Sequence, residues 1–135
     1  MIQSRIGIDT NILLRLRPND DLTQNHRIDA LVVEHGSTPG SPLIVDVVLA
    51  EALWTLRSAY GQSKPAQVAA LRSLLSEPAF AFENRATVEQ ALAWFESSSC
   101  AYSDCLIAAK HASLGCAFTA TLERGMRKLP GVQLV

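Results

Sequence analysis

Short apolar runs alternate with longer amphipathic stretches along the whole chain. The runs are about five residues long and rich in Ile, Val, Phe and Leu, which is typical of strands. We expect strands at residues 5–9, 42–46, 79–83, 116–120 and 132–135. Several of these runs lack the alternating polar positions of a half-exposed strand, which indicates burial on both faces.

The longer stretches carry apolar residues three or four positions apart, which is the spacing of one helix face. They predict helices at residues 11–17, 21–35, 47–60, 65–76, 87–96, 103–114 and 122–128. Asp46, Thr87 and Ser103 are the expected N-caps of three of these helices, because short polar side chains accept hydrogen bonds from the first turn. Gly115 is expected to end the helix over residues 103–114.

Strands that alternate with helices of this length favour a parallel sheet with helices on both faces. The chain has 135 residues, which is the usual length of one domain. We therefore predict a single α/β domain over residues 1–135 with a central parallel sheet of about five strands. In such sheets the active site lies beyond the carboxyl ends of the strands.

Four acidic residues follow predicted strands or begin the next helix. Asp9 ends the first strand, Glu51 lies in the second turn of a helix, Asp104 begins another helix, and Glu123 follows the fourth strand. Three of them have ordinary explanations: a helix cap for Asp9, a favourable helix-dipole position for Asp104, and an exposed first-turn acid for Glu123. The residues at helical spacing from Glu51 are apolar, which is unusual for a purely solvated glutamate.

Four carboxylates at one edge of a sheet repel one another, and a fold tolerates this when a cation binds between them. Oxygen ligands without His or Cys suit Mg²⁺ or Mn²⁺. Such an ion polarises phosphate oxygens and lowers the pKa of a bound water. The acids therefore indicate hydrolysis of phosphodiester bonds.

The order and spacing of four segments resembles PIN-domain ribonucleases, in particular the VapC toxins of bacterial type II toxin–antitoxin pairs. The segments are residues 8–15, residues 48–51 with Trp54 and Leu56 following, residues 103–109, and residues 121–124 leading to 129–132. The resemblance covers nearly the whole chain. It implies a PIN-like three-layer α/β/α fold and metal-dependent cleavage of RNA inside the cytoplasm.

The resemblance also implies a role for each matching residue. Asp9 and Asp104 would be the main metal ligands, and Glu51 would bind the metal directly or through water. Asn11 and Thr121 would orient carboxylates or water from a second layer. The ion would be Mg²⁺, for which Mn²⁺ can substitute.

The fourth acidic position departs from the family pattern. The family usually has Thr-x-Asp after the fourth strand, whereas this chain has Thr121-Leu122-Glu123. The spacing from Gly115 and to Pro130 favours Glu123 as the matching acid. A match at Thr119 would instead put Thr121 in the acidic position and leave three acids.

The family resemblance further implies a homodimer and a small VapB-like antitoxin whose tail blocks the acidic site. The RNA substrate would be a particular tRNA or ribosomal RNA loop. Six basic residues are candidates for a phosphate-contacting rim or for ordinary solvated surface: Arg15, Arg17, Arg57, Arg124, Arg127 and Lys128. The apolar face of residues 65–76 is either a dimer surface or part of the core.

Composition limits the alternatives. The formal net charge of −1 excludes a strongly basic nucleic-acid binder, and no apolar run reaches the ~18 residues of a membrane span. The first residues lack the apolar core of a signal peptide, so we expect a cytoplasmic protein. Cys100, Cys105 and Cys116 have no metal-binding spacing and are expected to be reduced, buried or half-buried thiols.

Two other functions remain open. A non-catalytic PIN-like module that binds RNA or protein would explain the altered fourth acid. A phosphotransferase with Asp9 as nucleophile is less favoured, because Asn11 stands where a second aspartate is commonly needed. That chemistry also needs a lysine near the phosphate, and Lys110 lies inside a predicted helix.

Overall fold

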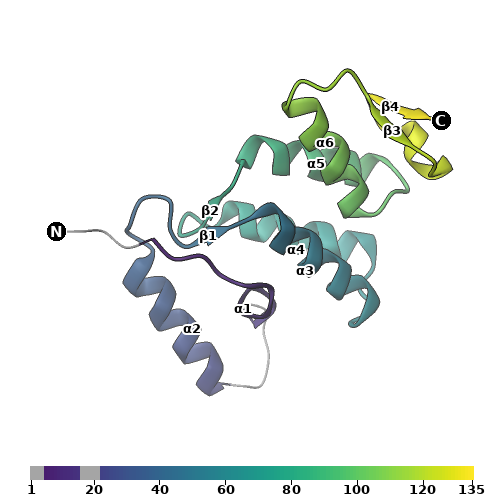
Figure 1. Ribbon diagram of the computed structural model, residues 1–135. Helices are drawn as coiled ribbons and strands as arrows, with labels where there is room; N and C mark the ends of the chain where they lie inside the picture. The colour runs from purple at the N-terminus through teal and green to yellow at the C-terminus, as the bar shows by residue number, and fades with distance from the viewer. Residues whose placement is uncertain (1–4, 16–21) are drawn as a thin grey trace.

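The computed structural model describes residues 5–15 and 22–135 (Figure 1). The helices are α1 (Thr10–Arg15), α2 (Leu22–His35), α3 (Asp46–Ser58), α4 (Lys64–Ser76), α5 (Arg85–Ser97), α6 (Tyr102–Ser113) and the short 3₁₀ helix η1 (Arg124–Lys128). The strands are β1 (Leu43–Ile44), β2 (Ala81–Phe82), β3 (Thr119–Thr121) and β4 (Val132–Leu134). Each strand lies within a predicted run or overlaps one.

The strands pair in parallel, as predicted. β1 pairs with β2, with Leu43 opposite Ala81, and β3 pairs with β4, with Thr119 opposite Val132. The segment 5–9 lies along the other side of β1 through a parallel bridge between Gly7 and Leu43. Two backbone hydrogen bonds hold this bridge: the Ile8 N–H donates to the Leu43 carbonyl at 3.0 Å, and the Leu43 N–H donates to the Ile6 carbonyl at 2.8 Å.

The described residues do not form the predicted single sheet of about five strands. The β1–β2 pair and the β3–β4 pair are separate two-stranded sheets, and Figure 1 shows β3 and β4 beside the C-terminus, away from β1 and β2. β1 is short because helix α3 begins at Asp46, with Val45 as its N-cap. The α/β class is nevertheless confirmed, since parallel strands alternate with helices that pack against them.

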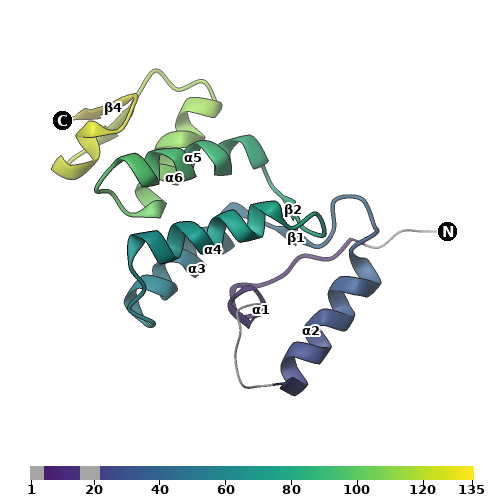
Figure 2. The same ribbon diagram turned by 180° about the vertical axis from the view of Figure 1, so that it is seen from behind.

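The hydrophobic core lies between α3, α4, α5 and α6. Figure 2 shows α5 and α6 side by side, with α3 and α4 next to them. Phe95 of α5 and Tyr102 of α6 are both almost fully buried and meet edge to face, with ring centroids 5.8 Å apart. In α4, Leu71 and Leu75 are buried in this core, so that part of the 65–76 face belongs to the core.

The predicted N-caps Thr87 and Ser103 are wrong. Asn84, not Thr87, caps α5, because the Asn84 side chain accepts the N–H of Thr87 at 3.1 Å. Helix α6 begins at Tyr102 with Ala101 as its N-cap, and no side chain caps it, so Ser103 is the second helical residue. The burial of Tyr102 in the core sets this start, which shows tertiary packing outweighing local cap chemistry.

All three cysteines are free thiols, as predicted, but they differ in exposure. Cys100 and Cys105 are buried, whereas Cys116 is exposed, so the prediction of burial was wrong for Cys116. Burial raises the pKa of the Cys105 thiol to about 11. Within residues 5–15 and 22–135, no helix is long and apolar enough to cross a bilayer.

Candidate functional site

Asp9 stands at the start of α1. Its backbone carbonyl accepts the N–H of Leu13 at 3.1 Å, and its side-chain oxygen Oδ1 accepts the N–H of Thr10 at 2.7 Å. The residue is exposed, as is Asn11 in the first turn of the helix. Asp9 therefore begins the helix, as the ordinary explanation expects, and its carboxylate remains open to solvent.

Glu51 lies on the exposed side of α3. Its neighbours Leu49 and Ala52 are buried in the core, while Val47 and Trp54, which share its helical face, are about 60% exposed. The helix face around Glu51 therefore carries two exposed apolar side chains. An ordinary solvated helix face is polar, so this face is unusual, as the sequence indicated. This side of α3 is the surface on which a ligand can reach the carboxylate.

Asp104 and Glu123 come from the C-terminal half of the chain. Asp104 is half-buried in the first turn of α6, and its N–H donates to the Ala101 carbonyl at 3.1 Å. Glu123 is exposed at the start of η1. The Thr121 hydroxyl accepts the Glu123 N–H at 3.0 Å and so shapes the turn that leads from β3 to Glu123.

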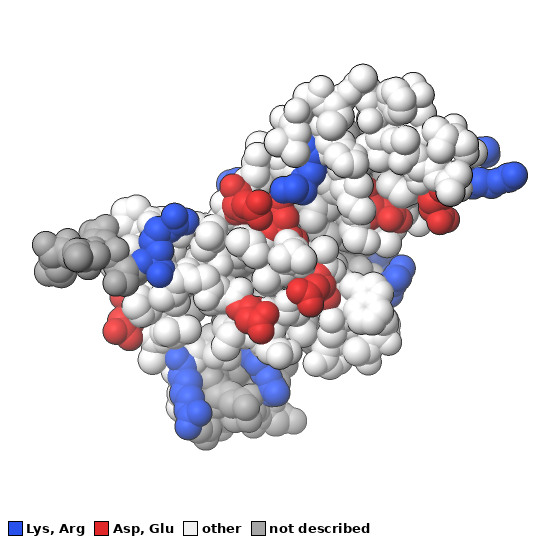
Figure 3. Space-filling view, viewed as in Figure 1, with Lys and Arg blue, Asp and Glu red and all other residues white. Residues whose placement is uncertain are grey.

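The structure does not bring the predicted acids into one group. Among residues 5–15 and 22–135, no three His, Cys, Asp or Glu side chains are placed so that they could hold a metal ion together. Figure 3 shows acidic side chains at several separate places on one face. The physical reason is the separation of the two sheets, since β3 does not pair with the segment that ends at Asp9. The carboxylates have the right chemistry for a hard divalent cation, but no three of them are grouped among the described residues.

Sequence reasoning missed an ion pair between the buried Asp46 and the partly exposed Lys110. The side chain of Asp46 is only 6% exposed, and Lys110 Nζ lies 2.5 Å from Asp46 Oδ2 and 3.6 Å from Glu83 Oε2. The Asp46 N–H also donates to Glu83 Oε1 at 2.9 Å. Asp46 is thus the first residue of α3 and makes no side-chain cap, contrary to the prediction. The buried Leu106, four residues before Lys110, was the available signal that Lys110 lies near the core.

The pairing has an electrostatic consequence for Lys110. The hydrogen bond to Asp46 raises the pKa of Lys110 above its usual value, and the charge of Glu83 adds to the effect. Lys110 is therefore charged and is paired with Asp46 and Glu83. It belongs to the packing of α6 on α3 and is not free to bind a phosphate.

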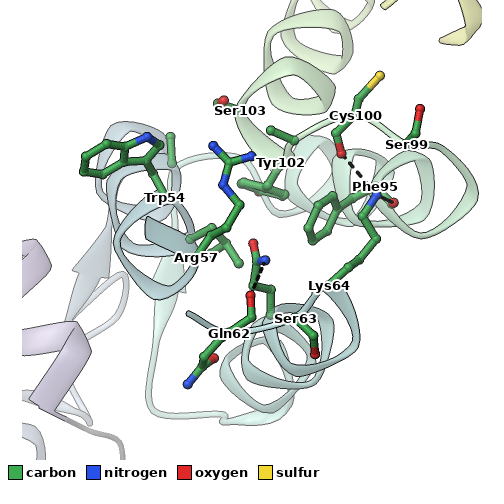
Figure 4. A pocket seen from close by; sticks show the side chains of 14 residues that line it. Trp54, Arg57, Gln62, Ser63, Lys64, Phe95, Ser99, Cys100, Tyr102 and Ser103 are labelled. Atoms are coloured by element: carbon green, nitrogen blue, oxygen red, sulfur yellow. Dashed lines mark hydrogen bonds between the residues drawn. The ribbon is translucent and has the colours of Figure 1, made fainter. Parts of the chain in front are cut away.

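A second polar feature is a pocket of about 360 Å³ between α3, α4 and the turn before α6 (Figure 4). Trp54 and Arg57 of α3 line it from one side, and Tyr102 and Ser103 line it from the start of α6. Lys64 of α4 also lines it, and its ammonium group donates to three carbonyls, those of Phe95, Ser98 and Cys100. The residues Ala50 and Ser103, which precede Glu51 and Asp104, are both part of the lining.

The basic residues proposed as a rim are exposed where the structure describes them. This holds for Arg15, Arg57, Arg124, Arg127 and Lys128. Arg17 lies outside the described residues. Of these side chains, Arg57 is the one that lines the pocket beside α6.

A model of a known protein family matches most of the chain. The family model of the PIN domain matches residues 6–132. The fold of that family is three-layer α/β/α, with which the parallel strands and flanking helices agree. No curated protein matches the chain.

Proposed function

Since this chain belongs to the PIN-domain family, whose members are generally metal-dependent nucleases, we propose that it is a Mg²⁺-dependent endoribonuclease and the toxin of a type II toxin–antitoxin pair. The family match carries the proposal, because residues 6–132 include all four predicted acids. The resemblance to VapC toxins in four ordered segments adds the finer part, the toxin role.

In this proposal Asp9 and Asp104 bind Mg²⁺, and Glu51 binds it directly or through water. When bound, the ion polarises a phosphate oxygen and lowers the pKa of a water. Glu123 is the fourth acid, and Asn11 and Thr121 orient the carboxylates. The exposure of Asp9, Glu51 and Glu123 supports the proposal, since these side chains are accessible to an ion and to RNA.

The proposed partners follow from the toxin role. The substrate is a structured RNA such as a tRNA or ribosomal RNA loop, and the enzyme acts in the cytoplasm as a homodimer. A VapB-like antitoxin inhibits it through an Arg or Lys that pairs with the carboxylates. The exposure of Asp9, Glu51 and Glu123 leaves these three carboxylates open to such a side chain.

The decisive experiment is cleavage of total RNA by purified protein, free of antitoxin, with Mg²⁺, with Mn²⁺ and with EDTA. We expect discrete metal-dependent fragments that are absent with Asp104→Asn. Asp29→Asn is the matched control, because Asp29 is an exposed acid on α2 that has no predicted role. No cleavage by a folded protein with either metal would contradict the proposal.

A second candidate is a PIN-like module that binds RNA or protein without cleaving it. The lack of a three-carboxylate group among the described residues favours it. It predicts that Asp9→Asn leaves the biological effect intact, whereas the nuclease loses its effect with this change. An aspartyl-phosphate mechanism is disfavoured further, because Lys110 is held by Asp46 and Glu83.

A further inference from the structure

We propose that the pocket between α3 and the start of α6 binds one nucleotide unit of single-stranded RNA, with its base on Trp54 and its phosphate on Arg57. The inference rests on the proposed function in one respect, namely that RNA is the substrate. It adds a binding subsite and two residues that hold the RNA.

The charge of the lining favours an anion. Two cationic side chains, Arg57 and Lys64, line the pocket, and no Asp or Glu of residues 5–15 and 22–135 does so. Lys64 already donates to three carbonyls. Arg57 is exposed and makes no hydrogen bond or ion pair with the part of the chain that the structure describes. Arg57 is therefore the cation that is available to a ligand, in a protein whose overall charge is −1.

The start of α6 also favours a phosphate close to Arg57. Ala101, Tyr102 and Ser103 line the pocket, and no side chain caps this 12-residue helix. The first N–H groups of a helix favour negative charge in front of them. Figure 4 shows the Arg57 side chain extending from α3 toward Tyr102 and Ser103. A phosphate placed here meets a guanidinium group and a helix N-terminus, in whose first turn Asp104 also lies.

Trp54 supplies a surface for the base. Its side chain is 60% exposed although it is a large apolar group, and it lines the same pocket as Arg57. Trp54 and Arg57 are three residues apart, so they are neighbours on one helix face. Bases stack on exposed aromatic rings, and phosphates pair with arginine. One tryptophan accommodates one base, which agrees with the low aromatic content of 6%.

The position of the pocket connects it to the predicted acids. Ala50 and Ser103 of the lining directly precede Glu51 and Asp104 in the sequence. A nucleotide held in the pocket therefore lies beside the two elements that carry these acids. The subsite would position RNA for the proposed cleavage without taking part in it.

The test measures RNA binding without cleavage, in EDTA. A labelled single-stranded oligouridylate of about eight nucleotides is titrated with protein, and its fluorescence anisotropy gives the dissociation constant. We expect Trp54→Leu to weaken binding about fivefold or more, and Trp54→Phe to retain most of the affinity. Trp54 is exposed, so both variants should fold, and thermal melting checks this. Equal affinity of Trp54→Leu and the wild type would overturn the stacking role.

The salt dependence tests Arg57 separately. Loss of one phosphate contact to a single strand reduces the slope of log affinity against log salt by about 0.7. We expect this reduction with Arg57→Gln and none with Arg27→Gln, which removes the same charge from α2 outside the pocket. An unchanged slope with Arg57→Gln would contradict the phosphate contact.

The outcomes distinguish this inference from the proposed function. If the wild-type protein binds the oligonucleotide through Trp54 and Arg57 but never cleaves RNA with metal, the subsite stands and the nuclease fails. If the protein cleaves RNA and Trp54→Leu and Arg57→Gln bind and cleave as well as the wild type, the nuclease stands and the subsite fails. Inorganic phosphate alone, at matched ionic strength, should compete only weakly; competition as strong as that of unlabelled oligonucleotide would overturn the role of the base.

Discussion

Lys110 Nζ lies 2.5 Å from Asp46 Oδ2, and this contact joins α6 to the first residue of α3. The two residues are 64 positions apart in the sequence. Because a buried carboxylate is costly unless it is paired, Lys110 supplies the ion-pair partner that the buried Asp46 side chain needs. Glu83, which directly follows β2, accepts a hydrogen bond from the Asp46 N–H and lies near the same ammonium group. The three side chains thus connect β2, α3 and α6.

Removal of the cation should destabilise the fold. Lys110→Met leaves the Asp46 carboxylate buried without its partner, so we expect a loss of about 1–3 kcal/mol in the free energy of unfolding. Urea denaturation measures it. Lys128→Met is the matched control, since Lys128 is exposed on η1. The double variant Asp46→Leu/Lys110→Met should lose less than Lys110→Met alone, because no charge remains buried. A Lys110→Met variant as stable as the control would show that the pair contributes nothing.

The same pair predicts a dependence of stability on alkaline pH. The pKa of Lys110 is raised above its ordinary value of 10.5 by the hydrogen bond to Asp46. The stabilisation by this lysine is therefore fully present below about pH 10.5 and is lost as pH rises through the higher folded-state pKa. We expect the difference in unfolding free energy between the wild type and Lys110→Met to shrink over this range. Denaturation from about pH 9 to about pH 12 checks this, and a difference that stays constant above about pH 10.5 would contradict it.

We expect Lys64 to stabilise the fold as well. Its three N–H donors match the three carbonyls of Phe95, Ser98 and Cys100, at 2.8, 2.5 and 3.1 Å, and its ammonium also lies over the Phe95 ring. Lys64→Met leaves these carbonyls unpaired where α5 turns toward α6, so we expect a loss of about 1.5–3 kcal/mol. The melting temperature of Lys64→Met measures the effect. A shift no larger than that of Lys128→Met would show that water replaces the ammonium group without cost.

The elements were predictable from the sequence because their signals are local. The run 42–46 contains β1, and the proline near the start of residues 65–76 places α4 correctly to within one residue. The N-cap of α6 was predicted wrongly, because the burial of Tyr102 against Phe95 depends on contacts between helices. Long-range pairing could not be predicted for the same reason. Nothing in the run 116–120 shows that, among the described strands, β3 pairs only with β4.

The candidate site was also predictable from the sequence only in part. The sequence located Asp9, Glu51, Asp104 and Glu123 near the starts of helices, which is a local property. Whether their carboxylates come together depends on how the two sheets are placed, and no local pattern encodes this. The Asp46–Lys110 pair was hidden for the same reason, as was the pocket beside Trp54.

Substitution of Glu123 tests whether the fourth acid acts on the metal directly or through water. The Thr121 hydroxyl holds the Glu123 N–H at 3.0 Å, while the Glu123 carboxylate is exposed. A glutamate one methylene longer than aspartate fits a ligand that acts through water, so we expect Glu123→Ala to reduce RNA cleavage less than Asp104→Ala does. Thr121→Val removes the acceptor for the Glu123 N–H and should lower cleavage by a similar amount to Glu123→Ala, because it frees the turn that carries this acid. Initial cleavage rates with Mg²⁺ measure all three variants. Complete loss of cleavage in Glu123→Ala, equal to that in Asp104→Ala, would show that Glu123 binds the metal directly.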